Sequence, residues 1–215
     1  MRALVIDDER LARKELIKLL EDFPEIEILG EAANVDEAYE LINSLNPDLL
    51  FLDIQMPGKT GFELLEMLDS VPTVIFTTAY DEYALKAFEV NALDYLLKPI
   101  QIDRLNDTIT KLEPPSVLSE DNDEPKLGLT DQVFVKDGDK CWFVSLKDIR
   151  YFESDGNYIK VFFDNFKPMI HKSLNALDEK LNDRDFFRAS RKHIINLSWV
   201  ESIEPWFNGG LMVKL

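Results

Sequence analysis

The sequence predicts an α/β domain built on a doubly wound, five-stranded parallel sheet, followed by a mostly β domain. Over the first half, short apolar runs alternate with amphipathic segments, which is typical of βα units. From residue 127 onward, aromatic and β-branched runs follow one another between turn residues. The charge changes at the same point, because residues 1–112 carry 10 basic and 23 acidic side chains, whereas residues 127–215 carry 13 of each. These three observations predict two domains of different architecture.

The predicted strands of the first domain are short apolar runs separated by helical periods. They are Ala3–Ile6, Ile26–Gly30, Leu49–Leu52, Val74–Thr77 and Asp94–Leu97. Apolar residues at helical spacing predict one helix face from Leu11, Leu16, Leu19, Leu20 and Phe23, and a second from Val35, Ala38, Tyr39, Leu41 and Ile42. Asn34 and Glu37 resemble a capping box at the start of the second helix. We expect a fourth helix over 84–88 and a fifth over 102–109.

The segment 113–126 separates the two domains. It reads EPPSVLSEDNDEPK, with three prolines and five acidic residues, and cannot bury a core. We therefore expect residues 1–112 to form one domain, 113–126 a flexible acidic linker, and 127–215 a second domain.

The second domain has one convincing helical segment among its strand-like runs. The expected strands are Val133–Val135, Trp142–Val144, Ile149–Phe152, Tyr158–Phe163, Pro168–His171, Val200–Ile203 and Leu211–Val213. Gly138, Gly156 and Gly209 lie in turn signals between several of them. The expected helix is Leu174–Leu181, capped by Ser173.

Composition excludes several classes of protein. A formal charge of −17 argues against a generally basic nucleic-acid binder, although a local basic patch stays possible. The single cysteine, Cys141, excludes an intramolecular disulfide framework. No apolar run approaches the ~18 residues of a membrane span, and the N-terminus lacks a signal-peptide core. We expect a cytoplasmic protein.

Polar residues lie at the carboxyl ends of four of the five predicted strands, where a doubly wound sheet gathers them into one crevice. They are Asp7, Asp8, Asp53, Thr78 and Lys98. Clustered carboxylates favour a hard cation such as Mg²⁺, and an ammonium and a hydroxyl can share the oxygens of a phosphoryl group. Asp53 is the candidate nucleophile, because a carboxylate can form an acyl phosphate. Taken singly, an aspartate at a strand end is more often a cap or turn residue, so the hypothesis rests on their joint placement.

The first domain resembles, over its whole length, the receiver domain of bacterial two-component response regulators, which has a flavodoxin-like fold. The matching motifs are Asp7-Asp8-Glu9, the stretch LDIQMPG over 52–58 followed by Gly61, Thr78-Ala79, Tyr95 and Lys98-Pro99. The family usually has a cis peptide at Lys98-Pro99.

The resemblance also implies residue roles. Asp8, Asp53 and the Gln55 backbone carbonyl would ligate Mg²⁺, with Asp7 acting mainly through water. Asp53 would accept a phosphoryl group from a sensor histidine kinase, with Lys98 and Thr78 as further catalytic residues. Thr78 and Tyr95 would form the switch, which alters the face of the fourth helix, fifth strand and fifth helix. Dimerisation on phosphorylation is expected through that face.

An enzymatic alternative is an aspartyl-phosphate phosphatase of the haloacid dehalogenase type. Those enzymes have Asp-x-Asp at the nucleophile, whereas position 55 here is Gln. We therefore expect no enzyme in the ordinary sense, only a phosphoacceptor that catalyses its own phosphorylation and dephosphorylation.

The most informative segment of the second domain is basic. Residues 184–192 read RDFFRASRK, and guanidinium and ammonium groups can neutralise phosphates and read guanine edges in the major groove. From this patch alone, a solvated charged loop is the more common interpretation, because the domain has no net charge.

The second domain resembles the LytTR-type DNA-binding domain. The match runs through LKDIRYFESDGNY at 146–158, FFRASRKHIINL at 186–197 and EPWFNG at 204–209. The resemblance implies an elongated, mostly β fold that places loops into successive major grooves. It implies DNA contacts by Asn157, Tyr158, Arg188, Arg191 and Lys192, and a bracing role for buried Asn196. Relative to the family pattern, we expect the last strand and helix to be missing after Leu215.

Together, these interpretations predict a two-component response regulator that binds repeated sites on double-stranded DNA and regulates transcription. The alternative is a phosphorylation-dependent protein-interaction module whose second domain does not bind DNA in this form.

Overall fold

The computed structural model describes residues 1–79, 94–112, 126–138 and 140–215. The chain divides into two compact units, residues 1–119 with 140–143 and residues 120–139 with 144–215. The predicted fourth helix and all of the predicted linker except Lys126 lie outside the described residues. No helix in the described ranges is both long enough and apolar enough to cross a membrane.

The first unit contains the predicted doubly wound sheet. Its strands are β1 (Arg2–Ile6), β2 (Glu27–Ala32), β3 (Leu49–Asp53), β4 (Thr73–Thr78) and β5 (Asp94–Leu97). All neighbours pair in parallel in the order β2-β1-β3-β4-β5. The order changes direction between β1 and β3, and such a switch point opens a crevice at the carboxyl ends of the strands.

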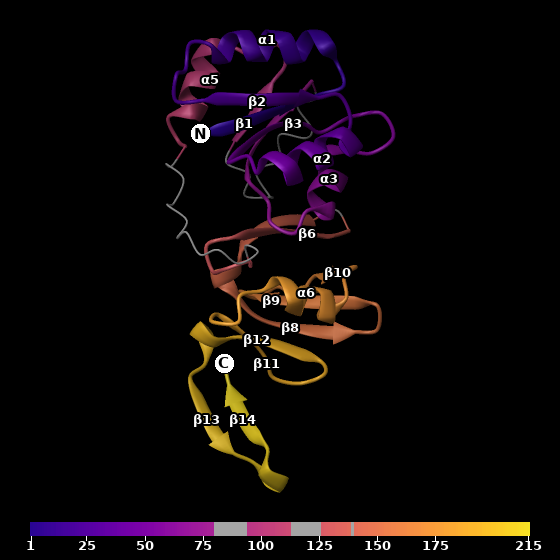
Figure 1. Cartoon of the computed structure of the whole chain (residues 1–215), viewed down its shortest axis with the longest axis vertical. Helices are drawn as coiled ribbons and strands as arrows, with labels where there is room; N and C mark the ends of the chain where they lie inside the picture. Colours follow the sequence, from indigo (N-terminus) through magenta and orange to yellow (C-terminus); the bar gives the residue numbers. More distant parts are fainter. Residues whose placement is uncertain (80–93, 113–125, 139) are drawn as a thin grey trace. The chain divides into compact units, whose positions relative to one another are not determined.

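Helices cover both faces of this sheet (Figure 1). Helices α1 (Arg10–Leu20) and α5 (Ile102–Ile109) lie on one face, and α2 (Val35–Leu45) and α3 (Gly61–Met67) lie on the other. The three central strands, β1, β3 and β4, are almost entirely buried, and the residues in the middle of each are apolar, as expected for strands covered on both sides. The core on the first face contains alternate strand residues, such as Val5 and Phe51, packed with Leu16 and Leu105 of the helices.

The buried face of α1 differs from the predicted one. Leu16 and Leu20 are buried as expected, but Leu11 is 74% exposed, and Arg13 lies on the buried face instead. The reason is helical geometry, because Arg13, Leu16 and Leu20 are three and four residues apart, whereas Leu11 precedes Leu16 by five.

The cap of α2 is only half of the predicted box. The Asn34 side chain accepts a hydrogen bond from the backbone N–H of Glu37 at 2.9 Å. The Glu37 carboxylate, however, accepts from the N–H of Ala33 rather than from that of Asn34. A complete capping box occurs at α3, which the sequence analysis did not predict, between Thr60 and Glu63.

The second unit is strand-rich, as predicted. The strands in this part of the chain are β6 (Gln132–Asp137), β7 (Lys140–Ser145), β8 (Ile149–Asp155), β9 (Tyr158–Phe163), β10 (Met169–Ile170), β11 (Phe186–Arg188), β12 (His193–Asn196), β13 (Ser202–Pro205) and β14 (Leu211–Lys214). Of these, the first four residues of β7 are grouped with the first unit. The central sheet has the order β10-β9-β8-β12-β11, and β6–β7 and β13–β14 are separate two-stranded sheets. Strands β11 and β12 were not predicted, because the charged segment 188–192 interrupts their apolar pattern.

Among the described residues of this unit, α6 (Leu174–Lys180) is the one α-helix, with short 3₁₀ turns at Leu146–Asp148, Leu197–Trp199 and Phe207–Gly209. The Ser173 hydroxyl caps α6 by accepting from the N–H of Ala176 at 3.1 Å, as predicted. Asn196 is fully buried, and its amide donates to the carbonyls of Leu146 and Ile149. The expected bracing role of Asn196 is therefore confirmed.

Candidate functional site

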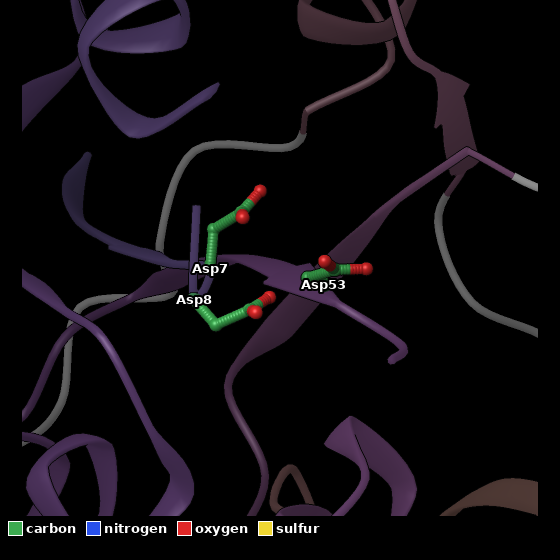
Figure 2. Close-up of side chains that lie close together, drawn as sticks. All are labelled: Asp7, Asp8 and Asp53. Atoms are coloured by element: carbon green, nitrogen blue, oxygen red, sulfur yellow. The ribbon is translucent and has the colours of Figure 1, made fainter. Parts of the chain in front are cut away.

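Three predicted aspartates meet at the β1/β3 switch point of the first unit. Asp7 and Asp8 follow β1 and Asp53 ends β3, and each offers one carboxylate oxygen within 4.8 Å of the other two. Figure 2 shows the three side chains next to one another. Asp7 and Asp53 are buried and Asp8 is half-buried, so their negative charges lie close together at limited exposure.

Lys98 partly compensates this charge from the end of β5. Its Nζ lies 2.6 Å from Asp7 Oδ2 and 2.9 Å from Asp53 Oδ2, with only 17% of the side chain exposed. The Lys98-Pro99 peptide is cis, as expected from the family resemblance. The ammonium group is thus held between two carboxylates that come from different strands.

The surroundings shift the pKa values of the lysine and of the proposed acceptor. Burial raises the pKa of Asp53 and the negative charge of Asp7 raises it further, against the opposing effect of the Lys98 hydrogen bond. Burial alone would lower the pKa of Lys98, but its hydrogen bonds to Asp7 and Asp53 raise the pKa overall. Lys98 therefore stays protonated and keeps its positive charge in the site.

The remaining predicted receiver residues lie on the adjoining strands. Thr78 is the last residue of β4 and is fully buried, and its carbonyl accepts a 2.8 Å hydrogen bond from the Lys98 N–H. Tyr95 is the second residue of the sheet's edge strand, β5, and is half-buried. Gln55 donates its backbone N–H to Asp53 Oδ1 at 3.2 Å. The strand ends thus gather Thr78 and Lys98 beside the three aspartates.

Arg13 is a buried neighbour of the site that the sequence analysis missed. Its Nη1 donates to the carbonyls of Asp7 at 2.7 Å and Asp8 at 3.3 Å, and its Nε donates to Glu31. The guanidinium therefore holds the backbone of the segment that carries two of the aspartates. A charged residue in register with Leu16 and Leu20 was the signal that could have revealed it.

The position of Gly61, at the start of α3, leaves no room for a side chain. A Cβ at this position would lie less than 3.0 Å from the Asp53 carbonyl oxygen, a distance that real Cβ atoms essentially never show. The Gly61 N–H also donates to the Ile54 carbonyl at 2.9 Å. The start of α3 can therefore pack directly against the strand that ends in Asp53.

The chemistry of this site fits a hard divalent cation. Three convergent carboxylates at limited exposure are an oxygen-rich donor set of the kind that Mg²⁺ prefers. Lys98 alone leaves a net negative charge among these four groups, which a dication would compensate.

In the second unit, two predicted DNA-contact loops lie at the same end of the central sheet. The turn between β8 and β9 carries Asn157, and Tyr158 follows it as the first residue of β9. The turn between β11 and β12 carries Arg191 and Lys192, and all four residues are exposed. The turns are neighbours because β8 pairs with β12 and the Ser154 N–H donates to the Lys192 carbonyl at 2.8 Å.

The fifth predicted DNA contact, Arg188, has a different environment. It ends β11, and only 24% of its side chain is exposed, because the guanidinium is bonded to groups of the protein itself. The sheet therefore presents Arg191 and Lys192 to solvent while Arg188 faces inward.

Comparison with known proteins agrees with both halves of this description. Residues 3–110 match the family model of the response regulator receiver domain, and residues 139–215 match that of the LytTR DNA-binding domain. A five-stranded parallel sheet with an acidic cluster at its switch point, joined to a LytTR domain, defines a DNA-binding response regulator. It is a signalling protein rather than an ordinary enzyme.

Several relatives match this chain along nearly all of its length. The sensory transduction protein LytT of Bacillus subtilis is 34% identical over 97% of this chain and 88% of its own length. LytT of Enterococcus faecalis is 36% identical over 100% of this chain and 90% of its own. A response regulatory protein of Vibrio cholerae is 39% identical over 97% and 87%. The chain belongs to the family of response regulators with a receiver domain and a LytTR DNA-binding domain.

Proposed function

We propose that this chain accepts a phosphoryl group on Asp53 from a sensor histidine kinase and controls transcription through DNA binding by its second domain. It catalyses only its own phosphorylation and dephosphorylation, and it acts in the cytoplasm. The observation that carries the proposal is the Lys98 ammonium held 2.6 Å from Asp7 and 2.9 Å from Asp53. A fixed cation beside a carboxylate nucleophile stabilises the charge that develops on a transferred phosphoryl group.

In the transfer step, an Asp53 carboxylate oxygen attacks the phosphorus of the donor phosphohistidine. The new P–O bond forms as the P–N bond breaks, and the imidazole leaves. The Lys98 ammonium then donates to a phosphoryl oxygen instead of to the free Asp53 carboxylate. Mg²⁺ bound by Asp8, Asp53 and the Gln55 carbonyl, with Asp7 acting through water, would neutralise the other phosphoryl oxygens.

The switch begins with Thr78. Once Asp53 carries a phosphoryl group, the Thr78 hydroxyl donates to it, and Tyr95 turns into the space that becomes available. Tyr95 lies on β5, beside α5, so its rotation changes the surface through which two receivers associate. Phosphorylation thereby favours the dimer.

The output is DNA recognition by the two neighbouring turns of the second unit. Asn157 and Tyr158 at one loop and Arg191 and Lys192 at the other contact DNA in its major groove. A dimer places two DNA-binding units on repeated half-sites, and this linkage raises the affinity for DNA without new contacts.

Phosphorylation on Asp53 can be tested with acetyl phosphate and Mg²⁺. We expect the intact mass of the protein to increase by one phosphoryl group, and the Asp53→Asn variant to show no increase. Asp22→Asn, which changes an exposed acid of the same domain, is the matched control. Modification of the Asp53→Asn protein at the wild-type rate would rule out Asp53 as the acceptor.

DNA recognition can be tested by selecting random duplexes with the 215-residue protein, with and without beryllofluoride as a phosphoryl mimic. We expect enrichment of a repeated motif that the Arg191→Ala/Lys192→Ala variant does not select. Failure of the folded protein to enrich any motif in either state would argue against DNA reading by this form.

A further inference from the structure

Arg188 binds to the protein itself through every nitrogen of its guanidinium. Its Nε donates to the Ser190 carbonyl at 2.8 Å, and its Nη2 donates to the Arg191 carbonyl at 2.9 Å. On the α6 side, its Nη1 donates to the Leu174 carbonyl at 3.0 Å and its Nη2 to Asn175 Oδ1 at 3.2 Å. A guanidinium has five N–H donors, and four of them are used in these bonds.

An acidic group also lies near this guanidinium. Arg188 Nη1 lies 3.7 Å from Asp178 Oδ2, also on α6. Four of the five donors are therefore used inside the protein, and the carboxylate beside Nη1 would repel a DNA phosphate. Arg191 and Lys192 are in the opposite situation, because their side chains are exposed.

The bonds of Arg188 connect two parts of the second unit. One part is the turn 189–192, which carries Arg191 and Lys192, and the other is the first half of α6. The turn has further fixed points, since the Lys192 N–H donates to the Ser190 hydroxyl at 3.1 Å and the Lys192 carbonyl accepts from Ser154 at 2.8 Å. The hydrogen bonds of Arg188 therefore link the turn to α6.

We propose that Arg188 is a positioning residue for DNA binding: it holds the turn 189–192 against α6 in the conformation that directs Arg191 and Lys192 into the groove. This inference rests on the proposed DNA-binding function and replaces the expectation that Arg188 contacts DNA. Only arginine suits the position, because a planar fork can bond several carbonyls in different directions at once. The lysine ammonium keeps the charge but cannot reach all these acceptors.

The decisive variant is therefore Arg188→Lys. A direct phosphate contact would largely survive this change, because lysine also binds phosphate as a point charge. If Arg188 positions the turn, we expect the DNA affinity of Arg188→Lys to fall toward that of Arg191→Ala/Lys192→Ala. Arg10→Lys, at an exposed position of the first domain, is the matched control and should leave affinity unchanged.

A second variant tests the α6 side without touching a basic residue. Asn175→Ala/Asp178→Ala removes one negative charge, so electrostatics alone predicts equal or tighter DNA binding. The positioning role predicts weaker binding instead. Both residues are on the helix surface, and helix content measured by circular dichroism reports whether the variant is folded.

A double-mutant cycle separates the two roles. Combined with Arg191→Ala/Lys192→Ala, the Arg188→Lys change should cost less than about twofold in affinity, because its effect passes through the residues already removed. An additive loss in the combined variant, or wild-type affinity of both Arg188→Lys and Asn175→Ala/Asp178→Ala, would overturn the proposal.

Amide hydrogen exchange of the DNA-free protein provides a readout that does not depend on DNA. We expect faster exchange at Ser190, Lys192 and His193 in Arg188→Lys than in the wild type, with unchanged exchange along β9. Unchanged exchange at these three amides would contradict the positioning role. Faster exchange together with a wild-type protein that binds no DNA would instead refute the proposed function and leave the structural role of Arg188 intact.

Discussion

The contacts of Lys98 determine how the acidic site of the receiver domain balances its charges. Replacing it with Gln leaves Asp7 and Asp53 close together without the cation that lies between them. Removing one charged donor from a site of developing charge typically lowers a rate by roughly 10²–10³-fold. We expect Lys98→Gln to slow phosphorylation by acetyl phosphate to about that extent. Lys59→Gln, an exposed lysine paired with Asp36, should leave the rate unchanged.

Asp94 is a buried carboxylate at the start of β5 that bonds to Arg104, Thr108 and Lys111. Burial alone would raise its pKa, but hydrogen bonds from Arg104, Lys111 and Thr108 of the α5 region lower the pKa from 3.8 to about 2. Because the carboxyl group is more acidic in the folded state, its contribution is fully present above pH 3.8 and is lost as the pH falls toward 2.

The corresponding variant is Asp94→Asn. We expect its free energy of unfolding at pH 7 to be about 2 kcal/mol lower than that of the wild type, from the size of the pKa shift. Chemical denaturation at a series of pH values should show this difference shrinking as the pH falls below 3.8. A constant difference down to pH 2 would mean that ionisation of Asp94 is not its source.

Gly61 is required for steric reasons. We expect Gly61→Ala to lower the free energy of unfolding by roughly 1–3 kcal/mol, because the new Cβ would be forced against the Asp53 carbonyl. The control is Gly30→Ala, where a Cβ would make an ordinary 3.6 Å contact with Leu4. Urea unfolding of both variants measures the difference, and equal stabilities would show that α3 can shift to make room.

At the scale of elements, the capping box of α3 is the clearest local determinant in the receiver domain. Thr60 and Glu63 satisfy each other's backbone N–H groups, and α3 has only 7 residues, so its own propensity contributes little. We expect Thr60→Ala to lower the free energy of unfolding by about 1 kcal/mol and Thr60→Ser to restore most of it. An unaffected Thr60→Ala protein in thermal or urea unfolding would show that packing alone holds α3.

Periodicity predicted the long elements better than the short ones. The five strands of the first domain and the capped helix α6 occur within one or two residues of the expected positions. The sequence analysis missed α3, β11 and β12, which have 7, 3 and 4 residues. Elements this short contain at most two turns or two alternations, so pairing with neighbours rather than their own pattern determines them.

At the scale of the whole molecule, the charge is distributed unequally between the two domains. The receiver domain carries most of the −17 net charge, whereas residues 127–215 are neutral overall with exposed Arg191 and Lys192. DNA affinity of one copy should therefore be modest and sensitive to salt. In the proposed function, two copies on adjacent half-sites would gain effective concentration, so dimerisation would be the step that phosphorylation controls.

This arrangement predicts a specific dependence on the DNA site. We expect beryllofluoride to raise the affinity for a duplex with two correctly spaced half-sites by at least about tenfold, with little effect on a single half-site. The Asp53→Asn protein should show neither effect in titrations at fixed salt. An equal gain on both duplexes would indicate that phosphorylation alters the DNA-binding unit directly instead of through dimerisation.

The sequence alone predicted the pair of domains, the meeting of Asp7, Asp53 and Lys98 at the carboxyl ends of the strands, and the bracing role of Asn196. The first two follow from hydrophobic period and from residues placed at strand ends, which are local in the chain, whereas the role of Asn196 was implied by the resemblance of residues 186–197 to the LytTR family. Only the tertiary structure decided the inward role of Arg13 under the Asp7–Asp8 segment and of Arg188 between its turn and α6. A long arginine side chain reaches partners that its own sequence neighbourhood does not specify, so the fold decides whether its charge faces solvent or backbone carbonyls.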